Sequence, residues 1–182
     1  PAWGLWDILK VGALFALVSE LLWRVCTDAN APPLLGRGDW IAAGFARLFL
    51  IGLILLVVLE ERRGAAAQLG LRGPFWSGLA TGLTAWLALQ PVFGMLEATQ
   101  LFLLPRVEMQ ETLVALLLTR DPWTVALIAL VAVVLAPVAE ELLFRGFLQP
   151  AAERWFGTGP AILLSAVFFA VAHPQFSVMA PM

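Results

Sequence analysis

Long apolar runs separated by short charged or proline- and glycine-rich segments make up most of the chain. A transmembrane helix needs about 20 mainly apolar residues, and about five of the runs suit such a helix. They cover residues 5–25, 40–59, 75–96, 122 to the acidic segment after 135, and 161–173. Pro91 is expected to break the third run. The pattern predicts an all-α fold, a polytopic transmembrane helix bundle of about five spans.

A shorter segment, 105–121, carries charges around an apolar centre and predicts a short amphipathic helix beside the membrane. The same pattern gives no sign of an internal repeat or of a low-complexity segment. We therefore expect a single membrane-embedded domain over residues 1–182.

The amino-acid composition supports a membrane protein. Hydrophobic residues make up 61% of the chain and charged residues 13%, whereas soluble domains have roughly 45–50% and about 25%. The net charge of −2 says nothing about nucleic acid, but no basic cluster is present, so no nucleic-acid partner is expected. Cys26 is the only cysteine, which excludes an internal disulfide.

The distribution of basic residues predicts the location and orientation. Lys10 is the only lysine, and arginine, alanine, glycine and leucine are abundant, which is typical of a bacterial protein from a GC-rich genome. Arg62, Arg63 and Arg72 lie between the second and third runs, and the positive-inside rule places them in the cytoplasm. The end of the fourth run, with Arg145, would then also face the cytoplasm. We expect an integral protein of the bacterial cytoplasmic membrane with its site near the cytoplasmic side.

The segment 136–150 contains an unusual group of charges. It follows the uncharged apolar run 124–135 and contains Glu140, Glu141 and Arg145. Each charge at the centre of a membrane helix costs about 2.5–3.5 kcal/mol on insertion scales, so intramembrane charges usually have a function. Glu141 and Arg145 are four residues apart and can pair on one helix face. Glu140 lies about 100° around the helix, so its carboxylate is available for chemistry.

His173 is the only histidine, and it ends the next predicted span. Consecutive spans joined by a short loop usually pack as neighbours, so we expect His173 to approach Glu140. A carboxylate and an imidazole that hold one water form a general-base pair. A lone histidine at a helix end is also common as a structural residue, and both interpretations stay open from these residues alone.

A metal centre is the obvious alternative to a metal-free pair. Catalytic zinc sites use three protein ligands and a water, and the chain has one histidine and one cysteine. The sequence therefore does not require a cofactor. If a divalent metal assists, Glu140 and His173 would be its ligands.

The motifs resemble those of a known family. Glu140-Glu141, three further residues and Arg145 resemble the first motif of the CAAX protease and bacteriocin-processing (CPBP, Abi-type) intramembrane proteases. Phe169 and His173, with three residues between them, resemble the second motif. The resemblance covers about residues 136–175, and the first 120 residues are similar mainly in hydropathy.

The resemblance implies a glutamate-dependent intramembrane endopeptidase of the metalloendopeptidase type. Glu140 and His173 would activate the water that attacks the peptide bond. Glu141 and Arg145 would orient the site, and Phe169 would form its wall. The implied partners are membrane lipid and a peptide or protein substrate that need not be prenylated.

The chain departs from the family in one respect. Members have a later His-x-x-x-Asn motif, proposed to stabilise the oxyanion, and it is not found before Met182. We therefore expect the chain to be truncated at its C-terminal end, with a motif-bearing core at 122–176, and its own activity to be in question. Two alternatives stay open: a non-catalytic scaffold or bacteriocin-immunity-type peptide-binding protein of the same fold, and a transporter that uses Arg47, Glu97 and Glu140 as relay groups. No inverted repeat supports the transporter.

Overall fold

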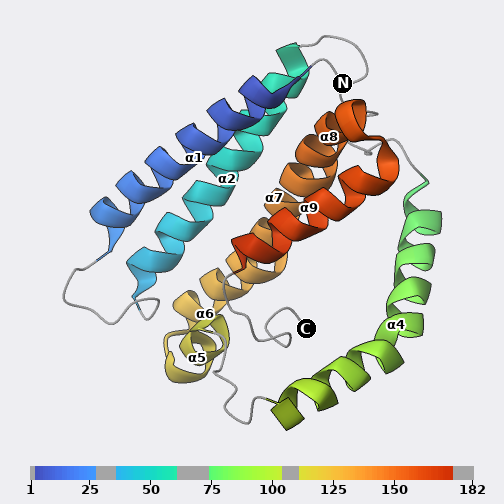
Figure 1. Ribbon diagram of the computed structural model, residues 1–182. Coiled ribbons are helices and arrows are strands. Elements are labelled where there is room, and N and C mark those ends of the chain that lie inside the picture. The colour runs from blue at the N-terminus through green and yellow to red at the C-terminus, as the bar shows by residue number, and fades with distance from the viewer. Residues whose placement is uncertain (1–2, 28–35, 61–73, 104–110, 174–182) are drawn as a thin grey trace.

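The computed structural model describes residues 3–27, 36–60, 74–103 and 111–173, and regular structure in these ranges is entirely helical (Figure 1). The predicted all-α fold is confirmed. The first helices along the chain are α1 (Leu5–Cys26), α2 (Arg37–Glu60), α4 (Phe75–Leu103) and α5 (Glu111–Leu118). Residues 61–73 and 174–176, on which the orientation and part of the predicted core depend, lie outside the described ranges.

A continuous helical stretch, Pro122–Phe156, forms the axis of the domain. It consists of α6 (Pro122–Ala129), the π-helical segment η1 (Leu130–Leu135), α7 (Ala136–Glu140), the π-helical segment η2 (Glu141–Leu148) and α8 (Gln149–Phe156). Gly157 then adopts φ 77°, a conformation that glycine adopts without steric cost, and reverses the chain into α9 (Thr158–Ala172). The acidic motif thus lies where the helical hydrogen-bonding pattern changes, a feature frequent at functional sites.

In the described part of the chain, three helices are long and apolar enough to cross a membrane: Arg37–Glu60, Trp76–Leu96 within α4, and Pro122–Phe156. A helical membrane bundle is therefore supported. The first and last predicted spans, however, are not long and apolar enough to be counted as membrane-crossing helices. Helix α1 has 22 residues but includes four charged ones, Asp7, Lys10, Glu20 and Arg24. Helix α9 has only 15 residues, fewer than the 17 or so that a span normally needs.

Two predicted boundaries differ from the structure. Pro91 does not break the third run, because α4 continues through it from Phe75 to Leu103; neighbouring groups can satisfy the carbonyl that a proline leaves free in a membrane helix. The last helix begins at Thr158 instead of residue 161, since Gly159 and Pro160 fit its first turn. The amphipathic helix predicted within 105–121 corresponds to α5, Glu111–Leu118.

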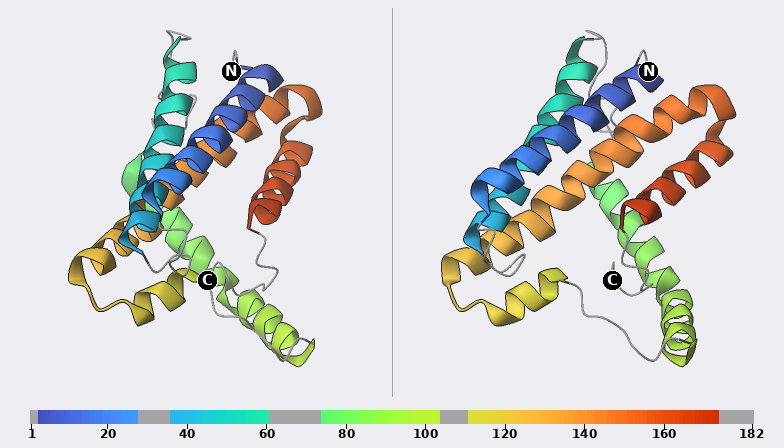
Figure 2. Two further views of the ribbon diagram at one scale, coloured as in Figure 1. Left: turned by 90° about the vertical axis from the view of Figure 1, so that its left-hand side faces the viewer. Right: turned by 60° about the vertical axis from the view of Figure 1, so that its left-hand side comes forward.

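Helix α2 packs between α1 and the long stretch, and α9 folds back along η2 and α8 (Figures 1 and 2). The main buried cluster joins Trp3, Val11, Leu50, Ile54 and other residues. Its largest fully buried side chain is Trp3, whose indole stacks on the Phe147 ring with centroids 5.7 Å apart and donates a hydrogen bond to the Phe147 carbonyl at 3.0 Å. The cluster holds the N-terminal segment against the motif-bearing stretch.

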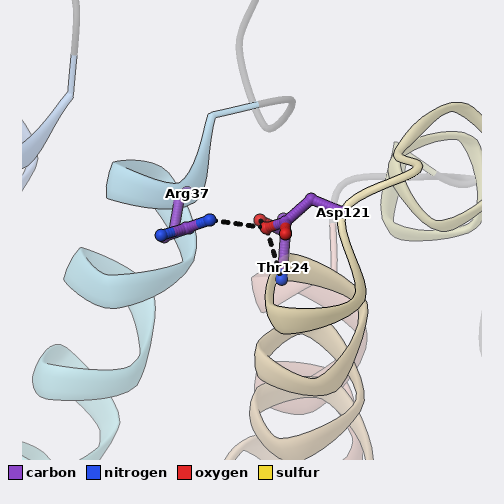
Figure 3. Close-up of polar contacts among 3 residues, drawn as sticks. All are labelled: Arg37, Asp121 and Thr124. Atoms are coloured by element: carbon purple, nitrogen blue, oxygen red, sulfur yellow. Dashed lines mark hydrogen bonds and ion pairs between the residues drawn. The ribbon is translucent and has the colours of Figure 1, made fainter.

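A polar contact holds the N-terminal end of α2 (Figure 3). Arg37 Nη2 lies 2.7 Å from Asp121 Oδ2, and this carboxylate also caps α6 by accepting from the Thr124 backbone N–H at 2.9 Å. Hydrogen bonds from the Thr124 hydroxyl and from Arg37 lower the pKa of Asp121 to about 2. The contact ties the beginning of α2 to the beginning of the long stretch and so sets the register between them.

Candidate active site

Glu140 is the last residue of α7, immediately before η2. Its neighbour Ala139 is 1% exposed and belongs to the main buried cluster with Leu50 and Ile54. Adjacent residues on a helix point about 100° apart, so the Glu140 side chain leaves this cluster and stays half-buried beside α9. The structure brings Glu140 to His173, with Oε1 and Nε2 3.7 Å apart.

Helix α9 presents His173 at its C-terminal end. The His173 backbone N–H bonds to the Ala170 carbonyl at 3.2 Å, and Nδ1 lies 2.8 Å from the Phe169 carbonyl oxygen. A carbonyl oxygen can only accept a hydrogen bond, so Nδ1 carries a proton and Nε2 faces the carboxylate. In neutral histidine, Nε2 is then a hydrogen-bond acceptor, and it faces a second acceptor, the Glu140 carboxylate.

The separation of Nε2 and Oε1, 3.7 Å, is too long for a direct hydrogen bond. A water beside both groups would donate one hydrogen to each and satisfy both acceptors. Glu140 and His173 remain 33% and 38% exposed, so water can reach them. This arrangement suits the activation of a water molecule by general-base catalysis.

An aromatic contact chain holds the histidine ring. The Phe169 ring lies 4.4 Å from the His173 ring, with a tilt of 32°. The same Phe169 ring makes an edge contact with Phe144, with centroids 5.2 Å apart. Phe144 is a buried residue of η2. The predicted wall residue Phe169 therefore connects the histidine to the segment that follows Glu140.

Ser165 supports the site, and no motif in the sequence predicts this role. Its buried hydroxyl donates to the Phe144 carbonyl at 3.1 Å, which joins α9 to η2. The sequence signal is a hydroxyl within the otherwise apolar run 160–172, eight residues before His173. Interhelical hydrogen bonds of this kind help to hold membrane helices together.

Glu141 and Arg145 form the predicted pair, with Oε1 and Nη1 2.6 Å apart and both side chains more than half exposed. Arg145 also lines a cavity of about 130 Å³ between η2, α8 and α9. Phe144, Gln149, Ile162, Ser165, Ala166 and Phe169 complete the lining. Neither Glu140 nor His173 lines this cavity, but Phe169 belongs to its lining and also contacts the His173 ring.

Within the described ranges, no group of three histidine, cysteine, aspartate or glutamate side chains lies close enough to hold a metal ion. Glu140 and His173 provide two donors. A catalytic zinc site of the usual kind uses three protein ligands, so the residues that the structure describes do not complete such a site.

Comparison with protein families gives one match. Residues 122–182 match the Rce1-like family, described as type II CAAX prenyl endopeptidase Rce1-like. Comparisons with curated proteins and with solved structures find no significant match. The matched range includes all five site residues predicted from the motifs: Glu140, Glu141, Arg145, Phe169 and His173. The match confirms the family resemblance over residues 122–182 and, at family level, supports a CAAX-type intramembrane protease.

Proposed function

We propose that the intact protein is an intramembrane endopeptidase that hydrolyses a peptide bond with a water activated by Glu140 and His173. The observation that carries the proposal is the separation of 3.7 Å between the glutamate carboxylate and the histidine Nε2. The pair is half-buried and lies on consecutive helices within the range that matches the Rce1-like family.

The proposed reaction follows from the two acceptors. The water donates one hydrogen to Glu140 and its oxygen attacks the scissile carbonyl carbon. Glu140 takes up the proton as the new C–O bond forms, and His173 orients the water through Nε2. The proton then passes to the leaving amine as the C–N bond breaks. The products are a carboxylic acid and an amine, and the carboxylate of Glu140 is regenerated.

The other site residues would support this reaction. Phe169 restrains the His173 ring through their contact at 4.4 Å. The Glu141–Arg145 pair lies beside the cavity that Arg145 lines and would orient the substrate backbone there. Phe144, Ile162 and Phe169 give this cavity an apolar part, which suits an apolar side chain of a membrane-associated peptide.

We propose that Glu140 and His173 activate the water directly, without a resident metal. Dialysis of the purified protein against EDTA should then leave the cleavage rate unchanged. A loss of cleavage that returns on addition of Zn²⁺ would show that the metal-free mechanism is wrong.

The test of the function uses the intact protein in lipid nanodiscs and quenched fluorescent peptides. One peptide ends in a farnesylated CAAX sequence and a second has the same sequence without the lipid. Glu140→Gln and His173→Ala should each lower cleavage at least a hundredfold, in line with a general-base contribution of about 10²–10⁴. Glu20→Gln is the matched control, because Glu20 forms an exposed ion pair with Arg24 in α1. Retained cleavage in either site variant would refute the proposed roles.

A further inference from the structure

Arg47 is a charged residue inside the apolar helix α2, and its side chain is half-buried. A charge in such a helix normally faces the interior of the bundle and has a partner there. Arg47 Nη1 makes a long hydrogen bond to the Ala43 carbonyl of its own helix, at 3.4 Å. This contact leaves most of the guanidinium hydrogen-bonding capacity for other groups.

The packing register places Arg47 opposite α7. Helix α2 and the long stretch run side by side in the same direction, starting from the Arg37–Asp121 contact (Figures 1 and 2). A Cβ atom on Gly44 would lie 3.3 Å from a methyl group of Val131, so the helices approach closely there. Farther along, Leu50 shares the main buried cluster with Ala139.

Arg47 is three residues after Gly44, which faces the long stretch, and three residues before Leu50, which belongs to the main buried cluster with Ala139. Residues at this spacing share a helix face, so Arg47 faces the same stretch between these two contacts. The guanidinium interacts electrostatically with Glu140. Glu140 thus lies beside the His173 imidazole of α9, 3.7 Å away, and also experiences the positive charge of Arg47 from α2.

We infer that Arg47 is a positioning residue for Glu140: its charge, presented by α2 at the level of α7, holds the Glu140 carboxylate beside His173. The inference rests on the proposed function, because it assigns Arg47 an effect on the reaction that Glu140 carries out. The nearby Glu141 and Arg145 neutralise each other at 2.6 Å. Arg47 is therefore the charge that compensates Glu140 from the neighbouring helix.

The test compares Arg47→Met, which removes the charge at similar volume, with Arg47→Lys, which keeps it. Arg24→Met is the matched control, because Arg24 forms its ion pair with Glu20 in α1. In Arg47→Met, kcat should fall about tenfold to a hundredfold, less than the roughly 10²–10⁴ that the general base itself contributes, with KM unchanged within about twofold. Arg47→Lys should recover most of kcat. Arg47→Gln replaces Arg47→Met if the latter does not fold.

A second measurement does not depend on activity. His173 is the only histidine in residues 1–182, so the imidazole NMR resonances that disappear in His173→Ala report on the position next to Glu140. These resonances should move in Arg47→Met, return toward the original values in Arg47→Lys, and stay in place in Arg24→Met. This readout follows the charge at the site and would not respond to a purely structural loss at a remote position.

The outcomes separate the two proposals. If Glu140→Gln and His173→Ala retain cleavage, the proposed function fails, and the His173 resonances still test the effect of Arg47. If both lose cleavage while Arg47→Met keeps its kcat, the inference about Arg47 is overturned. An Arg47→Lys variant as impaired as Arg47→Met, with unmoved His173 resonances in both, also overturns it.

Discussion

Replacement of Ser165 by alanine should weaken the attachment of α9 without abolishing the fold. Ser165 is 4% exposed, and its hydroxyl donates a hydrogen bond to the Phe144 carbonyl at 3.1 Å. That carbonyl also accepts the backbone N–H of Gln149, so it keeps a partner in the variant. Hydrogen bonds between membrane helices contribute on average about 0.6 kcal/mol and at most about 1.7 kcal/mol. We therefore expect a loss of about 0.6–1 kcal/mol in the free energy of unfolding.

The same magnitude limits the effect on cleavage. A loss of about 1 kcal/mol changes an equilibrium roughly fivefold, and a firmly docked α9 would stay docked in most molecules. The kcat of Ser165→Ala should therefore fall by less than about fivefold. Removal of the Glu140 or His173 side chain should have a far larger effect.

The assay is reversible unfolding in micelles of a mild detergent with increasing SDS, followed by circular dichroism. Ser19→Ala is the matched control, since the buried Ser19 hydroxyl has no hydrogen-bond partner among the described residues. It should be neutral or stabilising, because a buried hydroxyl without a partner costs free energy. Equal unfolding free energies for Ser165→Ala and Ser19→Ala would refute the role assigned to the Ser165 hydrogen bond.

Two further predictions concern the aromatic contacts of Phe169 and the Arg37–Asp121 contact at the beginning of α2. Phe169→Leu should lower kcat about tenfold with a smaller change in KM, because the His173 ring loses its aromatic contact. The control is Phe168→Leu, since Phe168 is exposed and its replacement should leave peptide cleavage unchanged. Equal effects of both changes would contradict the proposed role of Phe169 as a wall of the site. The pKa of Asp121 is lowered to about 2. At a pH above the ordinary aspartate pKa, about 3.9, the ionised Asp121 therefore stabilises the fold through its contact with Arg37. This stabilisation is lost as the pH falls toward 2. Unfolding in detergent between pH 5 and 2 should therefore depend less on pH in Asp121→Asn than in the parent, and parallel curves would show that Asp121 does not contribute.

The sequence predicted the elements better than their contacts. Apolar runs of span length located α2, α4 and the stretch Pro122–Phe156, because helix formation in a membrane depends mainly on local composition. The Glu141–Arg145 pair followed from spacing on one helix. The approach of Glu140 to His173 followed from the packing of consecutive helices.

Contacts that depend on the register between distant helices could not be predicted in this way. The sequence indicated Arg47 only as a relay group of the transporter alternative and could not identify Glu140 as its neighbour. That register depends on the close approach of α2 at Gly44 and on the Arg37–Asp121 contact. The role of Ser165 likewise depends on how α9 folds back after Gly157, and local patterning carries no information about that docking.

The π-helical segments are related to a local feature of the sequence, the position of two prolines. Each segment ends just before a proline at the start of the next α-helix: η1 before Pro137 in α7, and η2 before Pro150 in α8. A proline lacks the N–H that would continue the α-helical pattern, and its ring crowds the carbonyl four residues earlier. A wider preceding turn relieves this crowding without breaking the helix. Glu140 lies between the two prolines, so its direction toward His173 depends on turns that a period of 3.6 residues does not describe. The prolines that disturb the helix are thus part of what positions the proposed general base.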